Sequence, residues 1–314
     1  MLNRRFLRIK IMQALYSWFL DEDGNLPVAE KNLFTSINKF QELFLYLVSL
    51  LSNLHYYAKV DVEDRKVRKL PSSEDLNPNW KFFSNKVLTK ISSDLTIQKS
   101  LKSASVSWQN DIGLVKKILS DIKLNPVYAE YMVSGDISFE SDKSLVLSIL
   151  SELLPEHDLL TGWLEDKNMH WHEDPCEAYQ FLYKWIEHFR EDNAPRLPKL
   201  FRDEEDDHKF ISLLFCKTAI HSEEFEKAID KHTQNWEVDR IASIDILLIK
   251  MAMCEIRYLP NIPVKVSMNE YIDIAKDFST PQSGRFINGV LDKIVLEMKE
   301  QGLIQKAGRG LLET

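Results

Sequence analysis

Glycine is scarce in this chain, and this scarcity constrains the fold more than any other feature of the sequence. Only nine of the 314 residues are glycine, whereas globular domains average about 7%. Nucleotide-binding folds need glycines in the turns that approach phosphates, and no GxGxxG, P-loop, GxSxG or HExxH motif occurs. Because apolar residues still make up 44% of the chain, a sizeable core is available. The sequence therefore predicts a folded, mostly helical protein.

Apolar residues recur at spacings of three and four through most of the chain, which indicates successive helices. The first is expected over Arg4 to Leu20, with Asn3 as its N-cap. Further helices are expected over 33–57, 82–101, 106–122, 143–154, 176–189, 208–221, 223–231, 241–258, 264–278 and 281–299. We expect 241–258 to be central, because apolar residues surround most of it. Thr280 and Pro281 should supply the N-cap and first-turn proline of the last helix.

Features of compartment, membrane and metal chemistry are weak in this sequence. The three cysteines lack CxxC spacing, which fits a reducing cytosol without disulfides. Polar residues interrupt the apolar N-terminal stretch, no cleavage site follows it, and no apolar run is long enough to span a membrane. One loop contains His170, His172, Asp174 and Cys176. We do not expect it to bind a metal ion, because a second pair of ligands is missing. We expect a cytoplasmic protein without metal, cofactor or membrane span.

Basic side chains gather at the start of the first expected helix. The first 20 residues contain four basic side chains and no acidic one, although the net charge of the chain is −8. Arg4, Arg5 and Arg8 fall within an arc of about 100°, in turns where the helix dipole disfavours cations. Folding gives no reason for arginines there, whereas a polyanion does, because guanidinium groups and first-turn amides would point at the same phosphates. The alternative is that they are ordinary solvated arginines.

A second candidate site lies at the start of the last expected helix. Ser283 supplies a hydroxyl, Gly284 allows close approach, Arg285 is a cation, and Phe286 could stack on an unpaired base. A cap followed by a core phenylalanine is the alternative.

Two further segments are interpreted as boundaries. The acidic run 203–207 is either a domain boundary or a solvated helix start. Trp236, Asp239 and Arg240 precede the central helix, where Asp239 would cap it or pair with a cation.

Two segments resemble the NusB family of transcription antitermination factors. Residues 4–18, RRFLRIKIMQALYSW, are similar to the first helix of that family, and residues 236–294 are similar to its last three helices. The most specific strings are QALYSW, IPVKVSMNEYIDIAK and FINGVLDK, and residues 208–235 resemble the second and third helices more loosely. The resemblance implies an all-α, NusB-like helical bundle with a large helical insertion after the first helix.

The implied domain organisation divides the chain into three ranges. Residues 1–20 are the first helix of the bundle, residues 21–204 are the insertion, and residues 205–314 are the remainder of the RNA-binding domain. The insertion would bind another partner, contribute to a contact with NusE, or brace the bundle.

The resemblance also implies a function without covalent chemistry, so we expect no enzyme. NusB proteins bind single-stranded boxA RNA of nascent, chiefly ribosomal, transcripts together with NusE, a ribosomal small-subunit protein, within the transcription elongation complex. The RNA-binding residues of the family map onto Arg4, Arg5, Arg8, Ser283, Arg285 and Phe286. Gln282 and Gly284 depart from the family, which commonly has an acidic residue and a histidine at these positions.

Two alternatives come from other functional classes. One is an all-helical protein-interaction scaffold without RNA affinity. The other is an accessory domain related to RNA methyltransferases, to which NusB-like domains also occur fused. A methyltransferase would need a glycine-rich cofactor loop among alternating strands and helices, and the sequence has neither feature.

Overall fold

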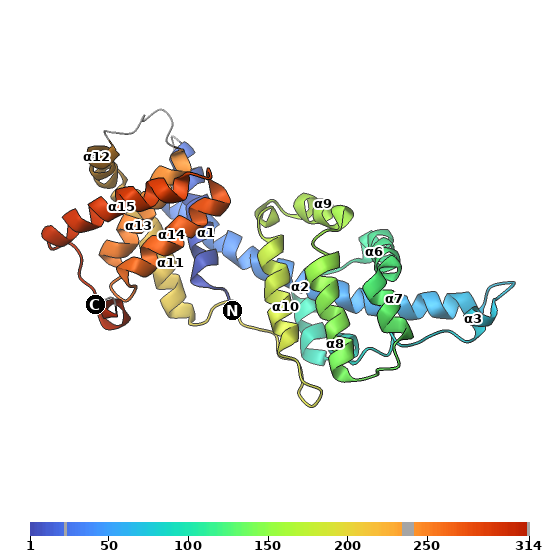
Figure 1. Ribbon diagram of the computed structural model, residues 1–314. Helices are drawn as coiled ribbons and strands as arrows, with labels where there is room; N and C mark the ends of the chain where they lie inside the picture. Colours follow the sequence, from blue (N-terminus) through green and yellow to red (C-terminus); the bar gives the residue numbers. More distant parts are fainter. Residues whose placement is uncertain (22–23, 234–241, 313–314) are drawn as a thin grey trace. The chain divides into compact units, whose positions relative to one another are not determined.

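Helices form all the regular secondary structure of the residues that the structure describes (Figure 1), which confirms the all-α class. A computed structural model describes residues 1–314 except 22–23, 234–241 and 313–314. Trp236, Asp239, Arg240 and Ile241, which the sequence placed at or before the central helix, therefore lie outside the described residues. The helices are α1 Arg4–Leu20, α2 Leu26–Lys66, α3 Ser73–Leu76, α4 Lys86–Ser93, α5 Leu95–Ser103, α6 Ile112–Leu124, α7 Pro126–Val133, α8 Phe139–Ser148, α9 Asp158–Lys167, α10 Pro175–Glu187, α11 Glu204–Ile220, α12 Ser222–Thr233, α13 Ser243–Tyr258, α14 Val264–Phe278 and α15 Ser283–Glu300.

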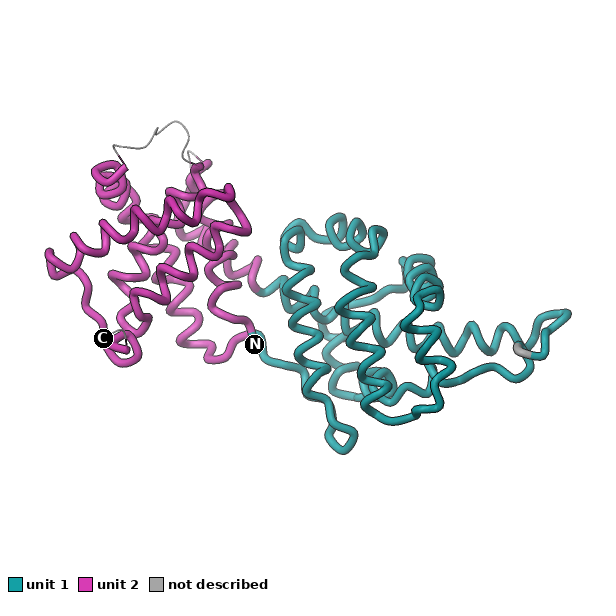
Figure 2. The backbone as a smooth tube through the Cα atoms, viewed as in Figure 1, with its two compact units in different colours: residues 1, 38–200 teal, residues 2–37, 201–314 magenta. Residues whose placement is uncertain are grey.

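The chain divides into two compact units (Figure 2). Unit 1 contains Met1 and residues 38–200, and unit 2 contains residues 2–37 and 201–314. The chain passes from unit 2 to unit 1 inside α2, so the sequence of unit 2 is interrupted by that of unit 1. The domain ranges 1–20, 21–204 and 205–314 drawn from the sequence stay a prediction.

Helix α13 is the centre of unit 2. It contacts α1, α11, α12, α14 and α15, and every side chain from Leu247 to Ile256 is buried. The apolar residues of α13 surround the helix instead of forming one stripe, and such a helix is stable only when neighbours cover it on all sides. The expected central helix is confirmed.

The two helix starts that carry the candidate site are built differently. At α1, the side chain of Asn3 accepts a hydrogen bond from the Phe6 N–H (2.7 Å), so the predicted N-cap is confirmed. At α15, the predicted cap is wrong: Gln282 occupies the N-cap position and makes no side-chain capping bond. Thr280 instead donates its N–H to Ser283 Oγ (3.2 Å), because a turn through residues 281–282 precedes the helix.

Unit 1 contains the long C-terminal part of α2 with shorter helices packed beside it. Helix α2 has 41 residues and extends beyond both ends of the predicted 33–57. The helix predicted over 82–101 is two helices, since the Asp94 carboxylate accepts the N–H groups of Thr96 and Ile97 and starts α5. Aromatic rings fill part of the core, where Trp108 stacks on Trp163 at a centroid distance of 4.3 Å.

Candidate functional site

Arg8, the third of the N-terminal arginines, lies inside unit 2. Its side chain is 3% exposed, and its Nε and Nη2 donate to the two oxygens of Glu255, each at 2.8 Å. Ser267 (2.7 Å) and Tyr271 (3.0 Å) donate their hydroxyls to the same carboxylate. Folding therefore does require this arginine, because a buried carboxylate needs a counter-charge and hydrogen-bond donors. The prediction that folding does not require Arg8 is wrong, because Glu255 is far from Arg8 in the sequence and only the fold brings the two side chains together.

The ionisation of this buried group follows from its partners. Burial by itself would lower the pKa of Arg8, but the hydrogen bonds and charge of Glu255 outweigh burial, and the pKa of Arg8 is raised. Burial, followed by the charge of Glu255, raises the pKa of Tyr271 well above its usual value. The cluster is therefore an ion pair with a neutral phenol at ordinary pH.

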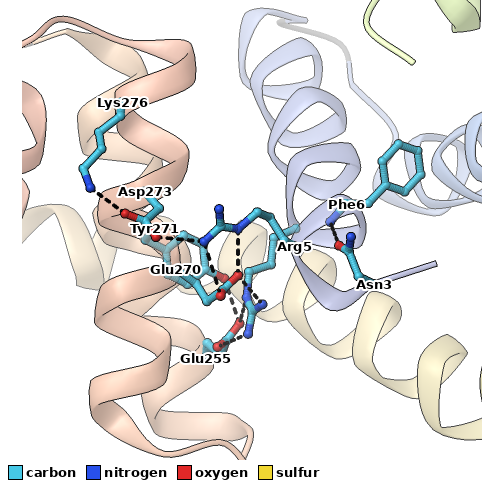
Figure 3. A network of polar contacts seen from close by, with 9 residues as sticks. Asn3, Arg5, Phe6, Glu255, Glu270, Tyr271, Asp273 and Lys276 are labelled. Carbon is cyan, nitrogen blue, oxygen red and sulfur yellow. Dashed lines mark hydrogen bonds and ion pairs between the residues drawn. The ribbon is translucent and has the colours of Figure 1, made fainter. Parts of the chain in front are cut away.

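Arg5 of α1 and the side chains of Glu270, Asp273 and Lys276 of α14 form a row of alternating charges (Figure 3). Glu270 accepts from Arg8 Nη1 (3.2 Å) and from Arg5 Nε (3.3 Å). Arg5 also donates to Asp273 (2.8 Å), and Asp273 accepts from Lys276 (2.6 Å). The hydrogen bond to Glu270 raises the pKa of Arg5. The hydrogen bond from Lys276, and after it the hydrogen bond from Arg5, lowers the pKa of Asp273. The side chain of Arg5 is half-exposed, and the carboxylates of Glu270 and Asp273 neutralise its charge.

Arg4 is held by α11 in the same manner. Its Nη2 lies 2.7 Å from Asp206 and its Nε 3.1 Å from Asp207, and its guanidinium lies 4.1 Å from the centroid of the Phe210 ring. The acidic run 203–207 forms the N-cap and first turn of α11, so the predicted helix start is confirmed, although Asp207 is buried and not solvated. The run also lies just after the border between the two units, and two of its carboxylates hold Arg4.

The second patch contains buried and exposed residues. Ser283 is buried and donates its hydroxyl to Asp245 at 2.7 Å. Phe286 is 6% exposed and belongs to the core of unit 2, so a base would stack on it only after the ring left the core. Arg285 is exposed. The structure thus gives Ser283 and Phe286 intramolecular roles and leaves Arg285 facing solvent.

Lys276 is a candidate that the sequence did not single out, and it lies between the two patches. Its Nζ shares Asp273 with Arg5. Its stem also lies beside Gly284, because a Cβ added to Gly284 would be 4.0 Å from Lys276 Cγ. Gly284 directly precedes Arg285 in the chain. In sequence, Asp273 and Lys276 look like an ordinary pair on one helix, and only tertiary packing brings α1 and α15 to either side of them.

Two further features concern the membrane and metal ions, in the part of the chain that the structure describes. No helix there is long and apolar enough to cross a membrane. Within the same residues, no three histidine, cysteine, aspartate or glutamate side chains are grouped so that they could hold a metal ion; this range includes the loop with His170 and His172.

Comparisons with known proteins identify one part of the chain. Residues 176–296 match the model of the NusB family. Transcription antitermination protein NusB of Salinibacter ruber is 48% identical over 103 residues, which are 33% of this chain and 64% of that protein. NusB of Chloroherpeton thalassium is 45% identical over 104 residues, which are 33% of this chain and 49% of that protein. NusB of Halalkalibacterium halodurans is 44% identical over 89 residues, which are 28% and 66%.

The matches cover part of each protein. The chain spans less than two thirds of the length of each of these relatives, and the family match does not include α1. No solved structure resembles the chain at a significant level. The matched range contains most of α10, all of α11 to α14 and most of α15, and α1 packs against α11, α13 and α14. Residues 176–296 are therefore the part of the chain that is similar to the NusB family.

Proposed function

We propose that this protein is a transcription antitermination factor that binds single-stranded, boxA-type RNA of nascent, chiefly ribosomal, transcripts together with NusE. The observation that carries the proposal is the 44–48% identity of its NusB-type domain to proteins named transcription antitermination protein NusB. The described cations at the ends of α1, α14 and α15 support it, because a single strand is bound chiefly through phosphates. The protein would act in the cytoplasm, within the elongation complex and without catalysis.

Within this proposal the six sequence-predicted residues divide into two groups. Arg4, Arg5 and Arg285 reach solvent and would contact RNA, with Lys276 between them as an added contact. Arg8, Ser283 and Phe286 are buried and would hold the helix starts in place. This division follows from exposure, since a phosphate binds only a cation that it can reach.

A surface for NusE is proposed at the other end of α1. Tyr16, Phe19 and Leu20 are exposed apolar side chains in the last two turns of this helix. Neighbouring exposed apolar residues are typical of protein interfaces. NusE bound there would leave the cationic start of α1 open to RNA.

Fluorescence anisotropy with a labelled boxA-like single strand tests the RNA-binding part. We expect tighter binding to the single strand than to a duplex of the same composition, because A-form duplexes hide their base edges. Each lost phosphate contact should flatten the slope of log affinity against log salt by about 0.7, so Arg285→Ala should show this change. Lys299→Ala is the matched control, because it removes the same charge from the same helix about 21 Å away. Equal affinity for single strand and duplex would contradict the proposal.

Addition of NusE tests the partner. Two proteins on one strand gain affinity through effective concentration, so NusE should lower the apparent dissociation constant of the wild-type protein at physiological salt. Phe19→Ser should remove that gain without changing the affinity of the protein alone. An unchanged dissociation constant on adding NusE would exclude the cooperative part.

A further inference from the structure

Each half-exposed arginine of α1 is held by one inner and one outer carboxylate. For Arg4 the inner partner is Asp207, 7% exposed, and the outer one is Asp206, 67% exposed. For Arg5 the inner partner is Glu270, 24% exposed, and the outer one is Asp273, 39% exposed. The same arrangement thus occurs twice, on two different helices, α11 and α14.

The inner carboxylates have structural partners besides the arginines. Asp207 Oδ2 accepts the N–H of Arg202 at 3.0 Å, and Glu270 is shared with the buried Arg8. The Phe210 ring also lies under the Arg4 guanidinium. The inner contacts are therefore sufficient to keep both guanidinium groups in place.

The outer carboxylates have no such structural role. Within the described part of the chain, the Asp206 side chain contacts Arg4, and the Asp273 side chain contacts Arg5 and Lys276. Both occupy the side of the cation that solvent reaches, which is also the side from which a phosphate would arrive. An exposed ion pair is worth little, so a phosphate can replace it, but the displaced carboxylate stays near and repels the phosphate.

We propose that Asp206 and Asp273 are specificity-determining residues that compete with RNA phosphates for Arg4, Arg5 and Lys276. This inference rests on the proposed RNA-binding function. Every RNA has backbone phosphates, and these bind weakly by themselves because the carboxylates of Asp206 and Asp273 repel them. A cognate strand adds contacts to its bases and to NusE, and these offset the repulsion. The two aspartates thus reduce the affinity for non-cognate RNA and raise the ratio between cognate and non-cognate binding.

The test compares Asp206→Asn/Asp273→Asn with a matched double variant, Glu205→Gln/Asp277→Asn. Both remove two negative charges from α11 and α14. Glu205 and Asp277 are exposed and make no ion pair with any other described residue, so the control reproduces the general charge effect only. Circular dichroism confirms that both variants remain helical. The probes are a boxA-like single strand and a mixed-sequence single strand of equal length, titrated over a range of salt concentrations.

We expect Asp206→Asn/Asp273→Asn to bind the mixed-sequence strand more tightly than the control variant does. The gain should be about fivefold for each carboxylate, as expected for unit charges 4 Å apart in water. For this double variant, the slope of log affinity against log salt should steepen by about 0.7 for each cation released. The ratio of cognate to non-cognate affinity should fall.

Two other outcomes overturn the inference and differ from each other. If the wild-type protein binds the boxA-like strand and Asp206→Asn/Asp273→Asn behaves like the control or binds more weakly, the aspartates position the arginines and do not compete. In that case the proposed function stands and this inference fails. If the wild-type protein binds neither strand, with or without NusE, both are wrong.

Discussion

Arg8 and Arg5 form the same kind of ion pair in different surroundings, and this difference predicts different mutational effects. Removing one member of a buried pair leaves an uncompensated charge and costs about 3–5 kcal/mol. Arg8→Ala leaves the buried Glu255 without its cation, so it should lower the free energy of unfolding by that amount. Arg5→Ala breaks exposed contacts, which are worth about 0–1 kcal/mol. Urea denaturation of both variants checks this. Similar losses for the two would mean that Glu255 is solvated when α1 changes.

Gly310 is required by the close approach of its backbone to the loop after α13. A Cβ on this residue would lie 2.0 Å from the Pro260 carbonyl oxygen, and the same carbonyl accepts the Ala307 N–H at 3.0 Å. Gly310→Ala should therefore detach the C-terminal segment 303–312, and limited proteolysis should cut it sooner. Gly135→Ala, where an added Cβ meets nothing within 4 Å, is the control. Equal cleavage of both variants would contradict this account.

At the scale of elements, α13 is enclosed by five neighbouring helices, and Cys254 reports on that enclosure. Burial raises the pKa of this thiol to about 12, so thiolate is scarce at pH 8 and labelling requires α13 to become exposed. Ellman's reagent should react rapidly with the exposed Cys176 and with Cys254 only on unfolding. The same burial should make unfolding easier above pH 9.0, the ordinary pKa of a thiol, where only the unfolded form ionises. Equal reaction of Cys254 and Cys176 in folded protein would show that α13 is accessible.

At the scale of the whole molecule, residues 38–200 of unit 1 interrupt the sequence of unit 2. The rings of Phe34 and Phe201 each lie 4.9 Å from His208 on α11, so the two ends of unit 2 that flank residues 38–200 are close together. A Gly/Ser linker of about six residues, which spans roughly 13 Å, should replace residues 38–200. We expect the shortened protein to unfold cooperatively and to keep a helical circular dichroism spectrum.

Removal of residues 1–20 from that shortened protein is the informative control. It takes away Arg8 and leaves Glu255 buried without its cation, so the helical signal and the cooperative transition should be lost. If the shortened protein with α1 is itself unfolded, unit 2 depends on unit 1, and the proposed domain organisation is wrong.

The sequence by itself determined the helices, because apolar spacing, caps and proline breaks act within a few residues. Helix α1 begins and ends as predicted, and so does α14. The prediction of Thr280 as N-cap is wrong, because a turn follows Thr280 and α15 begins only at Ser283. Tertiary structure decided which arginines face solvent. Three arginines on one helical arc are equivalent to a sequence argument, but Glu255, Glu270 and Asp206 arrive from helices about 200 to 265 residues away. The charge available to a ligand depends on those partners, since a buried, paired guanidinium has no phosphate-facing side.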